Sequence, residues 1–335
     1  MILLKNPSLS VTQCCRVLNH SRQAYYQAQR VDSQRAVVVS LIVDVCREVR
    51  RTHPGMGTKK LKLLLDERLQ AMALDISIGR DALYDVLRDC GLLIRQKKSK
   101  RRTTDSRHHL RRFSDLYNNF VPCRINQAWV ADITYWQIST GAFLYIHLVT
   151  DAYSRMILGW CLSTTLHASH TTAAFVMALE TLGQPIRERL LHHSDRGSQY
   201  CSDDYVAEAK KYDITMSMTQ SGDPLDNAIA ERVNGILKLE YLEHHNIETF
   251  EQAENLLFHS IHSYCHERPH MSLNDQTPYA LHTGTATLPI KRLWKAKTHQ
   301  VRSGPPSASP DVEPELTATS TSTESHQLST EIRNK

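Results

Sequence analysis

The sequence predicts an α/β domain over residues 124–285, preceded by an all-helical region over residues 1–93. Two observations predict this division. Before residue 93, apolar residues recur at helical spacing. After residue 124, runs rich in β-branched and aromatic residues alternate with helical segments. The order of three strands, helix, strand, helix, strand and helix indicates one mixed five-stranded sheet covered by helices.

The helical region begins with two short helices within residues 8–30, separated by the polar break "NHS". This is the pattern of a helix-turn-helix, although any small helical hairpin shows it as well. We expect a further amphipathic helix at residues 35–50. Residues 53–69 and 76–95 are expected to form a second helical pair, with Gly91 just past the end of its last helix.

A basic linker over residues 94–123 follows the helices. Its first part, "IRQKKSKRRTTDSRHHLRR" (94–112), holds nine Lys or Arg residues against one Asp. The stretch is either a solvated tether or a segment that tracks DNA phosphates. The candidate DNA contacts are Lys97, Lys98, Lys100, Arg101 and Arg102.

The α/β domain is expected to contain five strands and four helices. The expected strands are 126–138, 142–155, 156–165, 189–194 and 214–219. The expected helices are 169–183, 202–211 and 227–245, and residues 250–273 are expected to form a fourth helix followed by an exit loop. Residues 286–335 are first basic and then rich in Ser, Thr and Pro, and we expect them to be disordered.

Three carboxylates stand at the places where this domain would open a crevice. Asp132 lies within the first strand, Asp195 ends the fourth, and Glu231 lies one turn into the long helix. Each alone has an ordinary explanation as a strand-edge residue, a turn former or a solvated helix residue. Together they would supply hard oxygen ligands to Mg²⁺ or Mn²⁺, and the charge of a cation would offset the cost of partly burying them.

The long helix presents further polar residues at the same spacing. Asn227, Glu231, Asn234 and Lys238 are separated by four, three and four residues, so they share one face. Lys238 would lie about 10 Å along the helix axis from Glu231. An ordinary polar face of an amphipathic helix is the alternative.

These motifs resemble the catalytic frame of bacterial insertion-sequence transposases of the IS-three type, which are relatives of retroviral integrases. The resemblance rests on "WVADITYW", "LVTDAYSRMILGW", "HHSDRGSQY", "SGDPLDNAIAERVNGILKLE" and "YCHERPHMSLNDQTP", which occur in the family's order. The stretch "HPGMGTKKL" resembles the family's entry to a helix-turn-helix, although it lacks the usual tyrosine and arginine.

The resemblance implies an RNase H-like core in which Asp132, Asp195 and Glu231 bind two Mg²⁺ ions, for which Mn²⁺ can substitute. It implies cleavage of element ends by water, then attack of the freed 3′-hydroxyl on another phosphodiester. It further implies DNA contacts by Lys238, Asn227, Asn234 and Arg196, a homo-oligomer on DNA, and fusion to or partnership with an upstream-frame product. A nuclease that cuts without joining and a non-catalytic DNA-binding repressor are the alternatives.

The composition excludes several other classes. The eight cysteines form no C-x-x-C pair, which favours reduced thiols over a disulfide framework or a zinc site. No apolar run reaches the length of a membrane span and no signal peptide opens the sequence. The net charge of +5 permits a nucleic-acid partner without requiring one. We therefore expect a soluble cytoplasmic protein associated with the nucleoid.

Overall fold

The computed structural model describes residues 10–94, 113–118, 120–182, 189–220 and 227–288. The helical region contains α2 (Val11–Val17), α3 (Arg22–Thr52), α4 (Thr58–Ala71) and α5 (Arg80–Asp89). The side chains of Ser10 and Ser21 accept hydrogen bonds from Gln13 N and Ala24 N, so each of these serines caps the helix that follows it. Gly91 has a φ of 67° just beyond α5, as expected for a residue that ends a helix.

The prediction that the second short helix within residues 8–30 is separate from the helix at residues 35–50 is wrong. One helix of 31 residues, α3, covers both segments. The intervening residues include neither glycine nor proline, so nothing in the local sequence ends the helix there. The C-terminal half of α3 packs on α4 and α5 through a buried apolar cluster. That cluster includes Ile42, Val45, Val49, Leu61, Leu65 and Leu83.

The predicted five-stranded mixed sheet is confirmed. Its strands are β1 (Ala128–Gln137), β2 (Phe143–Asp151), β3 (Ile157–Ser163), β4 (Leu191–Ser194) and β5 (Thr215–Met218). Their order in the sheet is β3-β2-β1-β4-β5. The first three strands are antiparallel neighbours, whereas β4 is parallel to β1 and β5 is parallel to β4.

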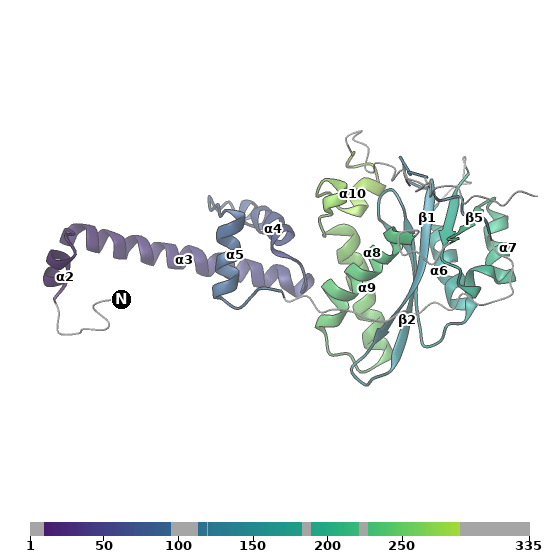
Figure 1. The fold of residues 1–335 in the computed structure, drawn as a ribbon, viewed down its shortest axis with the longest axis horizontal. Coiled ribbons are helices and arrows are strands. Elements are labelled where there is room, and N and C mark those ends of the chain that lie inside the picture. The colour runs from purple at the N-terminus through teal and green to yellow at the C-terminus, as the bar shows by residue number, and fades with distance from the viewer. Residues whose placement is uncertain (1–9, 95–112, 119, 183–188, 221–226, 289–335) are drawn as a thin grey trace, which may run out of the picture. The chain divides into compact units, whose positions relative to one another are not determined.

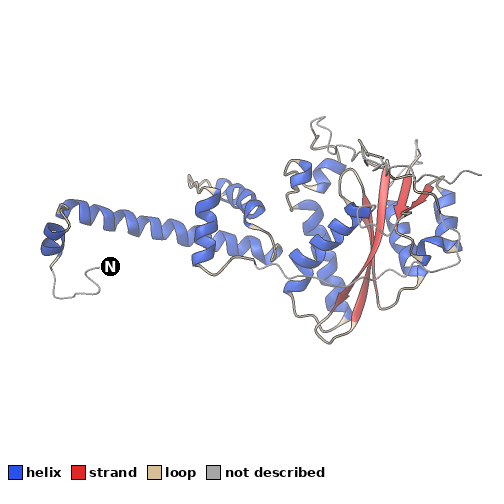
Figure 2. Ribbon diagram, in the orientation of Figure 1, coloured by secondary structure: helices blue, strands red, loops and turns tan. Residues whose placement is uncertain are grey.

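Helices cover both faces of this sheet (Figures 1 and 2). On one face lie α6 (Ala168–Glu180) and α7 (Asp203–Lys211), which bury the side chains of Trp129, Phe175 and Tyr205. On the other face lie α8 (Ala228–Ile236) and α9 (Phe250–His266), which pack on Trp136 and Leu148. Successive residues of β1 therefore point to different helical layers.

The long helix expected at residues 227–245 changes its geometry along its length. After α8, residues Leu237–Tyr241 form the π-helix η3 and Leu242–His244 form the 3₁₀ turn η4. The short elements η1 (Ser198–Cys201), η5 (Met271–Leu273) and α10 (Pro278–His282) complete the described fold. None of the helices in the described ranges is long and apolar enough to cross a lipid bilayer.

Part of the segment expected to be a linker contacts the sheet domain. The carbonyl of Ser114 accepts a hydrogen bond from Met218 N, and Leu116 N donates to Ser217 Oγ. Phe113 packs against the apolar cluster on the α6 and α7 face. Residues 113–116 therefore run beside β5.

Candidate active site

Asp132 and Asp195 lie side by side where the parallel pairing of β1 with β4 ends, in the middle of β1 and just after β4. The pairing of β1 with β4 places Ala131 opposite Ser194, so each aspartate follows a paired residue. Neighbouring strands are about 4.8 Å apart, which brings the two carboxylates within electrostatic range. The parallel register thus brings together two residues that are 63 positions apart in the sequence.

Both oxygens of the Asp132 carboxylate accept hydrogen bonds. Oδ1 accepts from Ile133 N at 2.9 Å, and Oδ2 accepts from Asn234 Nδ2 at 2.7 Å. Even so, burial and the nearby charges of Asp195 and Glu231 raise the pKa of Asp132 to about 7. The two hydrogen bonds oppose that rise but do not cancel it. A carboxylate in this situation is stabilised by any positive charge that binds beside it.

The loop after β4 is shaped around Asp195. The Asp195 Oδ1 atom accepts a hydrogen bond from Gly197 N at 3.0 Å. A Cβ atom on Gly197 would lie 3.1 Å from this same oxygen and 3.3 Å from the ring of Tyr200. Arg196 donates from Nε to the carbonyl of Thr219 at 2.9 Å, which ties this loop to the end of β5. These contacts fix the direction in which Asp195 presents its carboxylate.

The helix α8 brings Glu231 close enough to Asp132 for its charge to act on that carboxylate. Asn227 at its start donates from Nδ2 to the carbonyl of Ala131 at 2.9 Å, and Asn234 one turn beyond Glu231 donates to Asp132. Both asparagines are about 95% buried, whereas Glu231 is exposed. The two amides therefore hold α8 against β1 on either side of Glu231. DNA contact by Asn227 and Asn234 stays a prediction, as does the role of Arg196.

The donor chemistry of this site suits a hard divalent cation, since all three acidic groups offer oxygen. The carbonyl oxygens of both asparagine side chains are buried without a hydrogen-bond partner within the described part of the chain. Among these residues, no three His, Cys, Asp or Glu side chains are already close enough together to enclose a metal ion. The charges of Asp195 and Glu231 act on Asp132, and a bound cation would offset this concentration of negative charge.

Lys238 lies beyond Glu231 on the same helical path. Its Nζ atom is 4.3 Å from the centre of the Tyr135 ring, a cation–π contact. Burial lowers the pKa of Lys238 and the charge of Glu243 opposes this change. The backbone changes from α-helix to π-helix at Leu237, immediately before this lysine. Such π segments are frequent at functional sites.

Two tyrosines near the site were not singled out from the sequence. Tyr135 holds Lys238, and the fully buried Tyr200 has a hydroxyl with no hydrogen-bond partner among the described residues. Burial, followed by the charges of Asp195 and Asp132, raises the pKa of Tyr200. Both lie within the quoted motifs, but no residue pattern distinguishes them there from their neighbours. The predicted contacts Lys97, Lys98, Lys100, Arg101 and Arg102 lie outside the described residues.

The sequence of this chain matches models of a known protein family over the residues of the sheet domain. Two models described as "Integrase core domain" match residues 123–224 and 212–278, which together contain all three carboxylates. Among solved structures, the catalytic core of the HTLV-2 integrase, determined with magnesium, is 19% identical, covering 48% of this chain and 98% of that one, with a TM-score of 0.39. A chain in the structure of a simian T-cell lymphotropic virus intasome in complex with the PP2A regulatory subunit B56 gamma is 17% identical, covering 81% of this chain and 80% of that one, with a TM-score of 0.42.

Curated relatives come from bacterial insertion elements. An uncharacterized 31 kDa protein of the element IS600 from Shigella sonnei is 33% identical over 79% of this chain and 96% of its own length. A putative transposase of IS986/IS6110 from Mycobacterium tuberculosis is 34% identical over 56% of this chain and 66% of its own length. The transposase InsF of IS3A from Escherichia coli is 33% identical over 45% and 54% of the two. The chain therefore belongs to the IS3-type insertion-sequence transposase family, whose catalytic part is an RNase H-like integrase core.

Proposed function

We propose that this protein cuts DNA at the ends of an insertion element and joins the freed 3′-hydroxyl groups to another phosphodiester. One observation carries the proposal: the parallel pairing of β1 with β4, together with α8, couples the carboxylates of Asp132, Asp195 and Glu231 electrostatically. Membership in a family with named transposases supports the same reaction.

Asp132, Asp195 and Glu231 would hold divalent cations, Mg²⁺ or Mn²⁺, and two ions fit the proposed chemistry. Such ions activate an attacking oxygen and stabilise a leaving one in phosphoryl transfer. Asn234 keeps the Asp132 carboxylate turned toward α8 by donating to its Oδ2 atom. The attacking groups are water and then the DNA 3′-hydroxyl, so no side chain of this protein forms a covalent bond to DNA.

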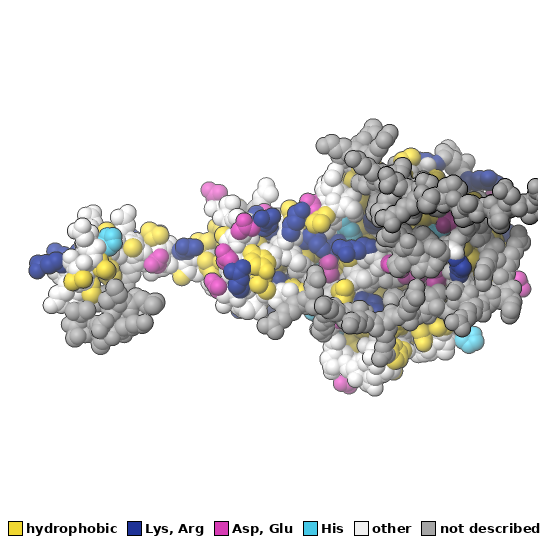
Figure 3. Space-filling view, in the orientation of Figure 1, with side chains coloured by type: hydrophobic (Ala, Val, Ile, Leu, Met, Phe, Trp, Pro, Cys, Tyr) yellow, Lys and Arg dark blue, Asp and Glu magenta, His cyan; other side chains and the backbone are white. Residues whose placement is uncertain are grey.

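The remaining residues of the site act by holding DNA. Lys238, fixed on the ring of Tyr135, is placed to contact a phosphate near Glu231. The helical region and the basic linker with Lys97 to Arg102 supply further phosphate contacts. In Figure 3 the Lys and Arg side chains of the described residues are interspersed with Asp and Glu, so the proposed DNA contacts rest on Lys238 and the basic linker and not on one continuous basic patch. Joining two element ends calls for more than one copy of the chain, with or without an upstream-frame product.

The test places the chain, with its upstream frame, in trans to a plasmid that carries the element's ends. Outward amplification then detects joined ends for wild type, Glu231→Gln and the control Glu251→Gln, which changes an exposed residue in the first turn of α9. We expect junctions with wild type and the control only. Junctions with Glu231→Gln would contradict the assignment of Glu231.

A second assay separates the alternatives. Purified protein is incubated with a duplex whose 3′-end is already exposed, and joined products are counted. Cutting of intact ends without any joining would favour the nuclease. Binding of the ends without cutting, by folded protein, would favour the DNA-binding repressor.

A further inference from the structure

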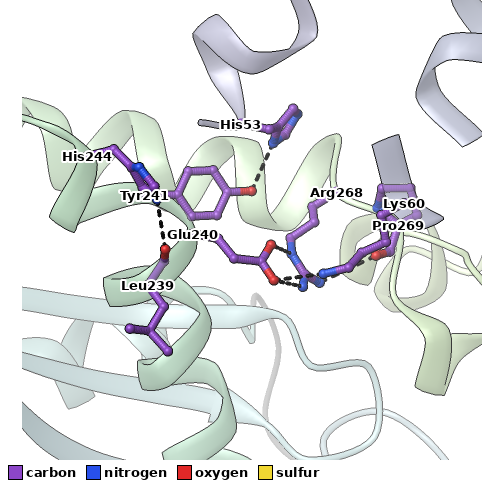
Figure 4. Close-up of polar contacts among 8 residues, drawn as sticks. All are labelled: His53, Lys60, Leu239, Glu240, Tyr241, His244, Arg268 and Pro269. Atoms are coloured by element: carbon purple, nitrogen blue, oxygen red, sulfur yellow. Dashed lines mark hydrogen bonds and ion pairs between the residues drawn. The ribbon is translucent and has the colours of Figure 1, made fainter. Parts of the chain in front are cut away.

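A buried ionic cluster links the loop between α3 and α4 to the helical path that carries Glu231 (Figure 4). We call it the Glu240 joint and define it as Gly55, Lys60, Glu240 and Arg268. Gly55 and Lys60 belong to the stretch "HPGMGTKKL", and Arg268 belongs to "HERPH". None of the four takes part in the site described above.

The side chains of the joint are fully paired. Glu240 Oε1 accepts from Lys60 Nζ at 2.7 Å and from Arg268 Nη2 at 2.8 Å, and its Oε2 accepts from Arg268 Nε at 2.8 Å. The three side chains are only 14%, 17% and 3% exposed for Lys60, Glu240 and Arg268. Burial would raise the pKa of Glu240, but the two cations lower it, so the carboxylate is ionised.

Backbone contacts fix the same joint. Gly55 N donates to the carbonyl of Glu240 at 2.8 Å. A Cβ atom on Gly55 would lie 2.6 Å from Glu240 Cα and 2.7 Å from the carbonyl of Leu239, so no larger residue fits without movement. Beside it, the buried ring of His53 contacts the hydroxyl of Tyr241 at 3.0 Å and the carboxylate of Glu267 at 3.2 Å.

A buried ionic cluster of this kind contributes little net free energy to folding. Removing charges from water costs free energy that the pairing often only balances, so apolar residues of similar size would serve a core as well. What a paired, directional cluster provides is a single geometry. Glu240 lies nine residues after Glu231 and two after Lys238 on the continuous path of α8 and η3. The joint therefore holds that path at a defined position relative to the start of α4.

We propose that Lys60 and Glu240 are positioning residues that set which phosphodiester is cut. The helical region holds the DNA of the element end, and the joint fixes how far from that DNA the three carboxylates lie. The inference rests on the proposed function, because it needs DNA cleavage at element ends. In this proposal the joint determines the position at which DNA is cut and takes no part in the chemical step.

The test maps cleavage on an end-labelled duplex that carries the element's terminus, at single-nucleotide resolution. Lys60→Met and Glu240→Gln remove one charge each, and Lys59→Met changes the exposed neighbouring lysine as a control. We expect wild type and Lys59→Met to cut at one position. For the joint variants, the fraction of cleavage events at neighbouring positions should be about tenfold larger than for wild type. A small displacement of the carboxylates disturbs the alignment of the reacting groups.

The charge-reversed triple variant Lys60→Glu, Glu240→Lys and Arg268→Glu reverses both ion pairs of Glu240 without leaving like charges together, and it should restore the single position. If a single variant fails to fold, the charge-reversed variant still tests the inference. Folded joint variants that cut only at the wild-type position would overturn the inference while leaving the proposed function intact. A folded charge-reversed variant that cuts at scattered positions, or does not cut, would overturn it as well. Absence of cutting by wild type would contradict the proposed function itself.

Discussion

At the scale of single residues, the position of Asp132 beside Asp195 and Glu231 has an energetic cost. Its pKa is raised from 3.8 to about 7 by burial and by Asp195 and Glu231. A raised acid pKa means that folding disfavours the ionised form. The free energy of unfolding is therefore expected to fall as pH rises from about 4 to about 7, and to remain lower above that range.

Asp132→Asn should consequently stabilise the protein when divalent cations are absent. We expect the free energy of unfolding at pH 8 to rise by roughly 1–3 kcal/mol, because solvent partly screens the carboxylate, and to rise less at pH 5. Denaturant titrations at both pH values, with a chelator present, measure this difference. Added Mg²⁺ should then stabilise wild type more than the variant. Equal stability of the two proteins at pH 8 would contradict the raised pKa.

Lys238 is the other residue whose environment predicts a measurable effect. Its ammonium group lies over the ring of Tyr135, and the charge of Glu243 acts on it as well. We expect Lys238→Gln to weaken binding of element-end DNA and to reduce the slope of log affinity against log salt by about one. Fluorescence anisotropy across a salt series measures the slope. Lys211→Gln on α7, which removes an exposed lysine paired with Glu208, should leave it unchanged.

At the scale of elements, Gly159 determines how closely α6 approaches β3. A Cβ atom at this position would lie 2.0 Å from the carbonyl of Ala174 and 2.7 Å from Ala178 N. Both are backbone atoms of α6 and cannot rotate away. Gly159→Ala should therefore lower the free energy of unfolding by about 3 kcal/mol.

The control for this change is Gly235→Ala within α8. An added Cβ there meets no atom within 4 Å. Since alanine favours helix, we expect a gain of about 0.5–1 kcal/mol. Thermal unfolding of both variants tests the pair, and a Gly159→Ala protein as stable as wild type would contradict the close packing of α6 on β3.

At the scale of the whole molecule, the exposure of the eight cysteine side chains differs with their position in the fold. None of the eight, which all lie in the described ranges, forms a disulfide, and five are buried: Cys14, Cys15, Cys46, Cys201 and Cys265. Burial raises the pKa of Cys46 to about 11 and of Cys265 to about 12, so neither forms a thiolate readily near neutral pH.

A thiol reagent should accordingly modify the native protein first at the exposed Cys90 and Cys123. The buried thiols should react only after unfolding, which denaturant would reveal as a rise to eight modified groups. Mass spectrometry of digested, labelled protein identifies the sites. Rapid labelling of Cys265 in the native protein would contradict the packing of α9 on the sheet.

The sequence by itself determined the strands and their order along the chain, and it predicted the three carboxylates of the candidate site. These features depend on local pattern: runs of β-branched and aromatic residues mark the strands, and the motifs around Asp132, Asp195 and Glu231 are short and continuous. Local pattern did not determine where helices end. The residues that join the two halves of α3 contain no helix breaker, and the change to a π-helix after Ile236 has no sequence mark that we recognised.

Only the tertiary structure decided which distant residues meet. The pairing of β1 with β4 placed Asp132 beside Asp195, and packing of α8 turned Asn227 and Asn234 into the interior instead of toward solvent. The Glu240 joint brings together residues that are 180 and 28 positions apart, Lys60 and Arg268 on either side of Glu240. Contacts of this kind depend on strand register and helix packing across the whole domain, so no local periodicity contains them.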